Sequence, residues 1–127
     1  MIDTPDHAPD RTQTVYKIVD AAIWREAEAA GRFEGAGIDL TDGYIHFSTA
    51  DQARETAARH YRGRDGLMRV AVDGAALDRE AGEAFRYEPS RGGALFPHLY
   101  AALPMACVSW ARPLPLGADG HVFPGGM

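Results

Sequence analysis

The sequence has little cysteine and lysine and no long hydrophobic run. Cys107 is the single cysteine, so no disulfide can form within the chain, and its apolar neighbours predict a buried, reduced thiol in a cytoplasmic protein. Nothing approaches the ~20 apolar residues that a membrane-spanning helix needs, and residues 1–13 lack the apolar core of a signal peptide. Lys17 is the only lysine. The other basic residues are arginines, and we interpret this bias as a composition effect without functional weight.

An excess of positive charge is also missing, since the net charge is -5. Proteins that bind nucleic acid in bulk or lie on an anionic membrane use a positive field, so both classes are excluded. A small nucleotide-like molecule held in a cleft remains compatible with this charge. The sequence does not determine the oligomeric state.

Composition and length indicate one soluble globular domain. The chain has 127 residues, of which 46% are hydrophobic and 24% charged. We expect a disordered leader over residues 1–13, a single α+β domain over residues 14–112, and a flexible Pro/Gly-rich tail over residues 113–127.

Hydrophobic periodicity predicts a mixed order of strands and helices. Asp20 is the predicted N-cap of a helix that Gly31 is expected to end. Thr49 and Gln52 match the capping-box pattern at the start of a second helix. Strands are predicted at 15–19, 44–48 (after an Asp42-Gly43 turn), 67–72, 84–88, 96–100 and 106–111, and helices at 21–30, 50–61 and, for one turn, 75–80. These elements suit an α+β fold in which two or three helices pack on small twisted sheets.

Two short runs carry the strongest functional signal. Because side chains alternate along a strand, Tyr44, His46 and Ser48 are expected on one face of the first run. Phe96, His98 and Tyr100 are expected to share a face of the second run. An imidazole beside a hydroxyl can act as a hydrogen-bond donor, a general base or a ligand anchor near neutral pH. The alternative for each histidine is a structural role in which the ring is satisfied within the core.

Other chemical candidates are weaker. No His-Glu-x-x-His or paired-cysteine spacing supports a metal site, and Ser48 lacks the Gly-x-Ser-x-Gly nucleophile elbow. Glu88 and Arg91 can serve as an acid and an anion clamp, or form an ordinary surface pair. Trp24 can floor a pocket for a flat ring, or pack as a core aromatic.

A family resemblance covers nearly all of residues 14–111. The chain resembles the small bacterial proteins catalogued as domain of unknown function 952. The matching stretches are Tyr16-Lys17-Ile18, Trp24 with Ala27 and Gly31, Asp42 to Ser48, Gln52, Thr56, Phe96 to Tyr100, and Leu103-Pro104.

The resemblance implies an ADP-ribosyltransferase-like fold, with small twisted antiparallel sheets around a cleft that binds NAD in active members. It implies that NAD is a candidate co-substrate, and a more distant likeness links the chain to RNA 2′-phosphotransferases. On this analogy His46 would hold a ribose, His98 and Tyr100 would lie across the cleft, and Arg91 would reach a phosphate. Glu88 or His98 would stand in for the glutamate that the transferases place late in the fold.

Three functional hypotheses therefore follow. The first is a transferase-like enzyme that binds NAD or a related nucleotide and acts at the ribose, with His46 and His98 catalytic. Its substrate-binding residues would be Tyr44, Ser48, Tyr100, Arg91, Trp24 and Glu88. The second is a catalytically inert ligand-binding or interaction module of the same fold, and the third a structural histidine pair without a pocket.

Overall fold

The computed structural model describes residues 9–90 and 92–124. The helices are α1 (Ala21–Ala30), α2 (Ile38–Asp42), α3 (Ala50–His60) and α4 (Gly74–Ala81), with short 3-10 turns at Gly82–Ala84 and Met105–Cys107. The strands are β1 (Val15–Asp20), β2 (Arg32–Phe33), β3 (Ile45–His46), β4 (Leu67–Val72), β5 (Phe85–Ser90), β6 (Ala94–Leu99), β7 (Leu103–Pro104), β8 (Val108–Leu114), β9 (Leu116–Gly117) and β10 (Gly120–His121).

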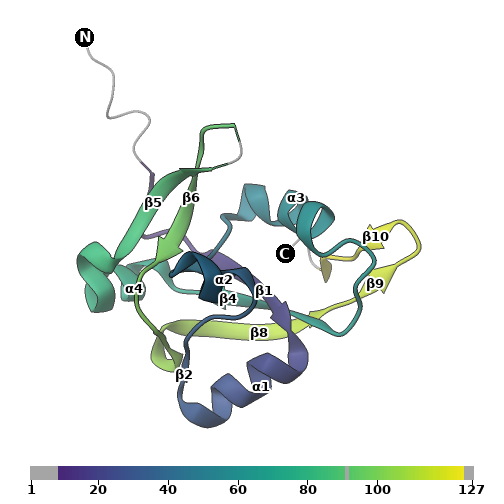
Figure 1. Ribbon diagram of the computed structural model, residues 1–127, viewed down its shortest axis with the longest axis horizontal. Coiled ribbons are helices and arrows are strands. Elements are labelled where there is room, and N and C mark those ends of the chain that lie inside the picture. Colours follow the sequence, from purple (N-terminus) through teal and green to yellow (C-terminus); the bar gives the residue numbers. More distant parts are fainter. Residues whose placement is uncertain (1–8, 91, 125–127) are drawn as a thin grey trace.

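Two three-stranded antiparallel sheets form the body of the molecule, as Figure 1 shows. One has the strand order β1-β4-β8 and the other β3-β6-β5, while β2-β7 and β9-β10 are two-stranded. The two larger sheets are joined where Tyr16 and Ser48 exchange backbone hydrogen bonds of 2.7 and 2.9 Å. The prediction of an α+β protein with small antiparallel sheets is confirmed, with four α-helices in the described residues instead of two or three.

Strand alternation divides the core into two parts on opposite faces of the β1-β4-β8 sheet. Val15 and Val19 of β1 belong to a cluster that includes the aromatic side chains of Trp24, Phe33 and Phe85. Ile18, which points to the other face, belongs to a cluster with residues of α3 and with Leu114 and Phe123. Lys17 has the same parity as Val15 and Val19, so its side chain enters the protein instead of the solvent.

Helix boundaries follow the caps that the sequence predicts. Asp20 accepts hydrogen bonds from the backbone of Ala22 and Ile23, and Gly31 ends α1 in the left-handed conformation. The capping box formed by Thr49 and Gln52 opens α3. Both predicted boundaries are confirmed because capping depends on contacts within one helical turn.

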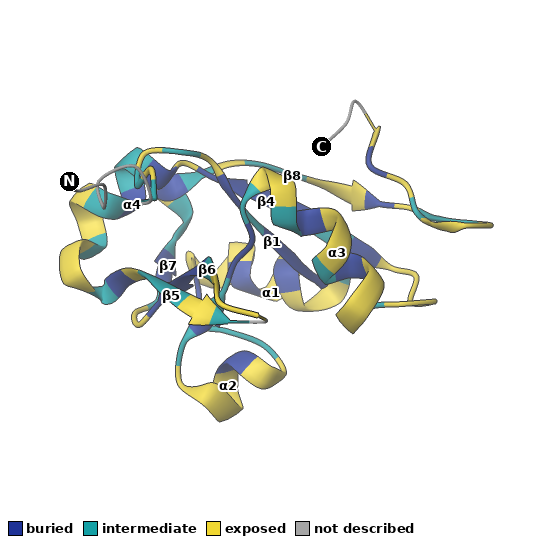
Figure 2. Cartoon of the chain, turned by 90° about the horizontal axis from the view of Figure 1, so that it is seen from above, coloured by how far each residue is buried: buried dark blue, intermediate teal, exposed yellow. Residues whose placement is uncertain are grey.

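Helix α2 is the α-helix of the described residues that the sequence did not predict. It projects from the body with most of its surface exposed (Figure 2), and Ile38 and Leu40 are 63% and 68% exposed. Asp39 is the exception at 2% exposed. Gly43 ends the helix with φ 86°, and the expected strand over 44–48 is reduced to Ile45–His46 and the Ser48 bridge.

Both expected disordered ends differ from the structure in their described parts. Residues 113–124 complete β8 and form the β9-β10 hairpin, and Phe123 is buried against the α3 side of the sheet. On the N-terminal side, Arg11 forms a 2.8 Å ion pair with Asp78. The predicted tail and leader are therefore wrong for residues 113–124 and 11–13, and residues 1–8 and 125–127 lie outside the described residues.

Candidate functional site

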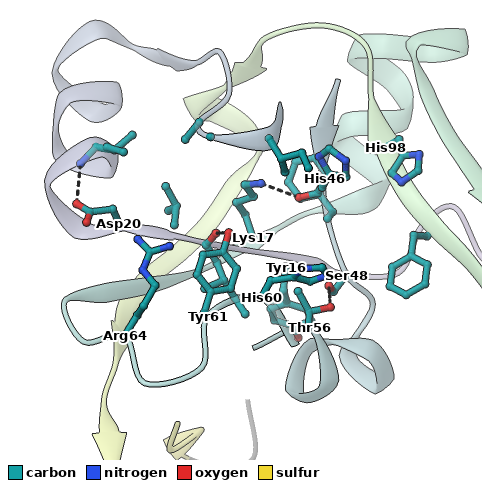
Figure 3. Close-up of a pocket in the computed structure, with 18 of the residues that line it drawn as sticks. Tyr16, Lys17, Asp20, His46, Ser48, Thr56, His60, Tyr61, Arg64 and His98 are labelled. Atoms are coloured by element: carbon teal, nitrogen blue, oxygen red, sulfur yellow. Dashed lines mark hydrogen bonds between the residues drawn. The ribbon is translucent and has the colours of Figure 1, made fainter. Parts of the chain in front are cut away.

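A cavity of about 480 Å³ lies between the two larger sheets (Figure 3). Its walls come from the outer edge of β1, the residues that lead into α2, the end of β3, the inner side of α3 and the β6 residues Phe96 and His98. Ligand pockets commonly enclose roughly 300 to 1,000 Å³, so this volume suits a small molecule. His46, Ser48 and His98 line it together, which places side chains from both predicted motifs around one space.

His46 and His98 meet because β3 and β6 pair in antiparallel register. The two residues lie directly opposite each other, and their ring centroids are 5.4 Å apart. Tyr44 stacks against both imidazoles, with centroid distances of 4.5 Å to His46 and 4.3 Å to His98. The structure thus brings the two imidazoles together, and an aromatic ring holds their relative positions.

Both ring nitrogens of His46 lie within hydrogen-bonding distance of a carboxylate. Nδ1 lies 2.6 Å from Asp39 Oδ1, and Nε2 lies 3.0 Å from Asp42 Oδ2. Asp39 also accepts a 3.0 Å hydrogen bond from the backbone N–H of His46. The ring is therefore fixed in position, and neither nitrogen is open to a ligand unless a carboxylate moves.

Lys17 and Asp39 form an ion pair beneath His46. Lys17 Nζ donates to Asp39 Oδ2 at 2.8 Å, to Asp39 Oδ1 at 3.0 Å and to the carbonyl oxygen of His46 at 3.0 Å. Burial lowers the pKa of Lys17, and the charge of Asp39 opposes this effect. Burial alone would raise the pKa of Asp39, but the hydrogen bonds and charge of His46 and Lys17 outweigh it and lower that pKa. Asp39 is therefore held as a carboxylate.

His98 has a different environment from His46. Its Nδ1 lies 2.8 Å from Glu88 Oε1, and the Tyr100 hydroxyl donates to the same oxygen at 2.8 Å. A carboxylate can only accept, so Nδ1 carries the proton and Nε2 holds the lone pair of the neutral ring. Among the described residues, Nε2 of His98 has no hydrogen-bond partner, although the side chain is 5% exposed.

The pKa directions agree with this arrangement. Burial lowers the pKa of His98, an effect that Glu88 opposes and the nearby His46 reinforces. The hydrogen bond from His98 lowers the pKa of Glu88 despite some burial. A neutral imidazole whose far nitrogen is held by a carboxylate is the arrangement of an oriented general base.

Ser48 is committed to a structural contact. Its Oγ lies 2.7 Å from the hydroxyl of Thr56 on α3, and its backbone bridges to Tyr16. Within residues 9–90 and 92–124, no imidazole or carboxylate is hydrogen-bonded to this hydroxyl. Ser48 therefore lacks the base that would activate it as a nucleophile, and it serves as part of the cavity wall.

The remaining predicted site residues are Tyr44, Tyr100, Glu88, Trp24 and Arg91. Tyr44 covers both imidazoles and packs against Tyr100, with ring centroids 4.9 Å apart, and neither tyrosine lines the cavity. Glu88 lies on β5, within the strand predicted over 84–88, and contacts His98. Trp24 is 1% exposed and packs on Phe33, so the prediction that it lines the pocket is wrong. Arg91 lies outside the described residues.

Four charged residues were not predicted from the sequence as part of the site. Lys17, Asp39 and Asp42 lie close to His46, and Arg64 lies at the far end of the cavity. For Lys17, the available signal was its position between Tyr16 and Ile18 in an apolar strand, where a charged residue needs a buried partner. The acidic residues of the 39–42 segment gave no such signal, since they resembled an ordinary turn.

The described residues contain neither a cluster of metal-ligating side chains nor a membrane-spanning helix. No group of three or more His, Cys, Asp or Glu side chains in residues 9–90 and 92–124 has the arrangement of a metal site. Within the same residues, no helix has the length and apolar character needed to cross a membrane.

Comparison with known proteins identifies relatives without assigning an activity. A family model described as "Protein of unknown function (DUF952)" matches residues 18–111. The crystal structure of protein CC0527 from Caulobacter crescentus is 47% identical, with a TM-score of 0.79 over 86% of this chain and 92% of that chain. The solution NMR structure of CC0527 is 46% identical, with a TM-score of 0.73 over 85% of this chain and 90% of that chain. No curated protein matches the chain.

Proposed function

The chain belongs to this family of unknown function, and we propose that its cavity binds NAD or a related nucleotide and that the protein acts at the ribose of that ligand. The observation that carries the proposal is the state of His98. It is a buried imidazole, oriented by Glu88 through Nδ1, with an unpartnered Nε2 among the described residues, and it lines a cavity of ligand size.

The lining of the cavity supports a ligand with both a flat apolar part and polar groups. Ile18, Val19 and Phe47 supply apolar surface, whereas His98 and Thr56 supply polar atoms. Pockets of this mixed character bind drug-sized molecules through apolar contact and orient them through a few polar groups. Nucleotides combine a flat base with a hydroxylated sugar and a phosphate, so they fit this pattern.

The arrangement of the sheets also supports an ADP-ribosyltransferase-like reading. Two small antiparallel sheets flank the cavity, and they touch through the bridge between Tyr16 and Ser48. This architecture is compatible with a split-sheet fold that binds a nucleotide between its halves. Fold alone does not determine a reaction, and the chemistry is therefore argued from His98.

The reaction we propose is a transfer at ribose C1′. The bond from C1′ to the leaving base breaks with its electron pair going to the base, and a bond forms from C1′ to an acceptor oxygen. His98 Nε2 takes the proton of that acceptor, and Glu88 stabilises the resulting imidazolium through Nδ1.

Ligand titration and a product assay test the proposal. Purified protein is titrated calorimetrically with NAD, ADP-ribose, AMP and nicotinamide, and release of free nicotinamide from NAD is followed by chromatography. We expect binding in the micromolar to millimolar range for the nucleotides, lost when Phe47→Trp fills the cavity wall. Absence of binding of every nucleotide at millimolar concentration, with the fold intact by circular dichroism, removes the proposal.

A catalytically inert ligand-binding module of the same fold is the second candidate. The observation that favours it is His46, since both of its ring nitrogens are already bonded to carboxylates. The variant that carries both His46→Ala and His98→Ala separates the two candidates. An inert module shows no turnover in the parent protein and retains its ligand in this variant, whereas an enzyme loses a turnover that the parent has.

A further inference from the structure

We propose that the end of the cavity formed by Asp20 and Arg64 recognises a phosphorylated ribose, with Arg64 binding the phosphate and Asp20 a sugar hydroxyl. This inference rests on the proposed nucleotide site and names the part of the ligand that lies farthest from His98. Figure 3 shows Asp20 and Arg64 at one end of the pocket, with Lys17 in the middle and His98 at the other end.

Arg64 presents a guanidinium that no described carboxylate neutralises. Its charged group lies over the ring of Tyr61, 5.2 Å from the centroid, and no ion pair is recorded for it among residues 9–90 and 92–124. The backbone of Arg64 is fixed, because its N–H donates to the carbonyl of Tyr61 at 2.9 Å and its carbonyl lies 2.7 Å from His121 Nε2. A planar guanidinium held on an aromatic ring suits bidentate binding of a phosphate.

Tyr61 provides the platform for this group. Its hydroxyl donates a 3.0 Å hydrogen bond to the carbonyl oxygen of Ile18 on β1, an edge strand of its sheet, and this bond fixes the ring against the sheet. Tyr61, Ile18 and Arg64 all line the cavity. Arg64 is exposed, and the ring of Tyr61 is the contact that orients its guanidinium.

Lys17, which also lines the cavity, has no free N–H group with which to bind an anion. Lys17 Nζ has three protons, and each has an acceptor, two on Asp39 and one on the carbonyl of His46. Its charge is compensated by Asp39 in the interior of the protein. Arg64 is consequently the side chain in the described lining whose strong positive charge remains available for a phosphate.

Asp20 adds a hydrogen-bond acceptor at the same end. Its Oδ1 accepts the N–H groups of Ala22 and Ile23 as the N-cap of α1, and Oδ2 has no recorded partner within the described part of the chain. Asp20 and Arg64 both line the cavity, yet no ion pair links them. A carboxylate oxygen beside a guanidinium matches a sugar hydroxyl next to a phosphate better than it matches a lone anion, because the carboxylate would repel the anion.

The phosphate part is tested by comparing AMP with adenosine in calorimetric titrations. We expect AMP to bind the parent protein roughly tenfold or more tightly than adenosine, since charge-assisted hydrogen bonds are stronger than neutral ones. In Arg64→Gln this preference disappears, while adenosine affinity changes less than about twofold. The matched control Arg62→Gln, a nearby exposed arginine outside this cavity, keeps the preference.

The hydroxyl part is tested with 2′,3′-dideoxy-AMP. Asparagine is a good N-cap, so Asp20→Asn keeps α1, removes the carboxylate charge and replaces the second carboxylate oxygen with an amide donor. We expect the preference for AMP over the dideoxy analogue to fall about threefold to tenfold in this variant.

The outcomes separate this inference from the proposed function. Equal affinities of the parent for AMP and adenosine, or an unchanged phosphate preference in Arg64→Gln, overturn the assignment of Arg64 while leaving a nucleotide site in place. An unchanged preference over the dideoxy analogue in Asp20→Asn overturns the assignment of Asp20. Failure of every nucleoside and nucleotide to bind overturns the proposed function itself, and this inference with it.

Discussion

Lys17 and Asp39 form a salt bridge of 2.8 Å in which the side chains are 6% and 1% exposed. The pair links β1 to α2 and supports His46 from below through Asp39. A buried ion pair is weak evidence for stability, because removal of both charges from water is unfavourable. The clearest consequence of this ion pair is that it holds α2 against β1, because α2 is otherwise largely exposed.

Loss of one partner of this salt bridge is expected to destabilise the protein more than loss of both. Asp39→Ala leaves the Lys17 ammonium buried without a counter-charge, and we expect unfolding in urea to show a loss of about 3 to 5 kcal/mol. The double variant Lys17→Met with Asp39→Leu should recover most of that loss. The exposed pair Arg59–Glu55 is the control, and Glu55→Ala should change stability by less than about 1 kcal/mol. A double variant as unstable as Asp39→Ala contradicts this account.

His98 should make stability depend on pH below its ordinary pKa. Burial lowers its pKa from 6.5 in the fold, so the unfolded chain binds the proton more readily. The stability contribution is therefore present above pH 6.5 and is lost as the pH falls through the folded-state pKa. His98→Gln should remove this part of the pH dependence in urea titrations between pH 7.5 and 5.

The same imidazole offers a direct spectroscopic readout. Nitrogen-15 NMR of the His98 ring at pH 7.5 should show a protonated Nδ1 and an unprotonated Nε2. Glu88→Gln removes the charge that raises the pKa of His98, so its pKa should fall further. A ring protonated on Nε2, or a pKa that rises in Glu88→Gln, contradicts the assigned role of Glu88.

Gln52 is expected to stabilise the start of α3 and its contact with β6. Its Oε1 accepts the N–H of Thr49 at 3.0 Å, and its Nε2 donates to the carbonyl of Leu95 on β6 at 2.7 Å. Gln52→Ala removes a helix cap and a contact between two elements, and we expect thermal and urea unfolding to show a loss of about 1 to 2 kcal/mol. Asp51→Ala, at the adjacent exposed position, should have a smaller effect.

Loss of the His98 imidazole should reduce turnover more than a change in the contact between Asp42 and His46. With NAD as substrate, His98→Ala is expected to lower kcat by roughly 10² to 10⁴ with little change in KM, because it removes the general base. Asp42→Asn alters the contact to His46 Nε2 and should have a smaller effect on kcat. Steady-state kinetics with Glu55→Ala as the surface control measure both, and equal losses in His98→Ala and Asp42→Asn contradict the separate roles.

Much of the fold was predictable because it depends on neighbours in the chain. The capping residues Asp20 and Thr49 set helix starts within one turn, and strand alternation indicated the shared face of Tyr44 and His46. Helix α2 was missed because its five residues are too few for a helical period to be recognised. Trp24 was assigned to a pocket although it lies in the core, since the sequence does not reveal which aromatic side chain the sheets will cover.

The amino-acid sequence by itself determined the α+β character, the caps of α1 and α3, and the presence of one histidine in each of two extended runs. The tertiary structure alone decided that β3 and β6 pair in the register that sets His46 opposite His98. It also decided that Asp39 reaches Lys17 and that Glu88 reaches His98. The physical reason is that local periodicity acts over a few residues, whereas charge pairing and pKa depend on burial and on partners brought together only by folding.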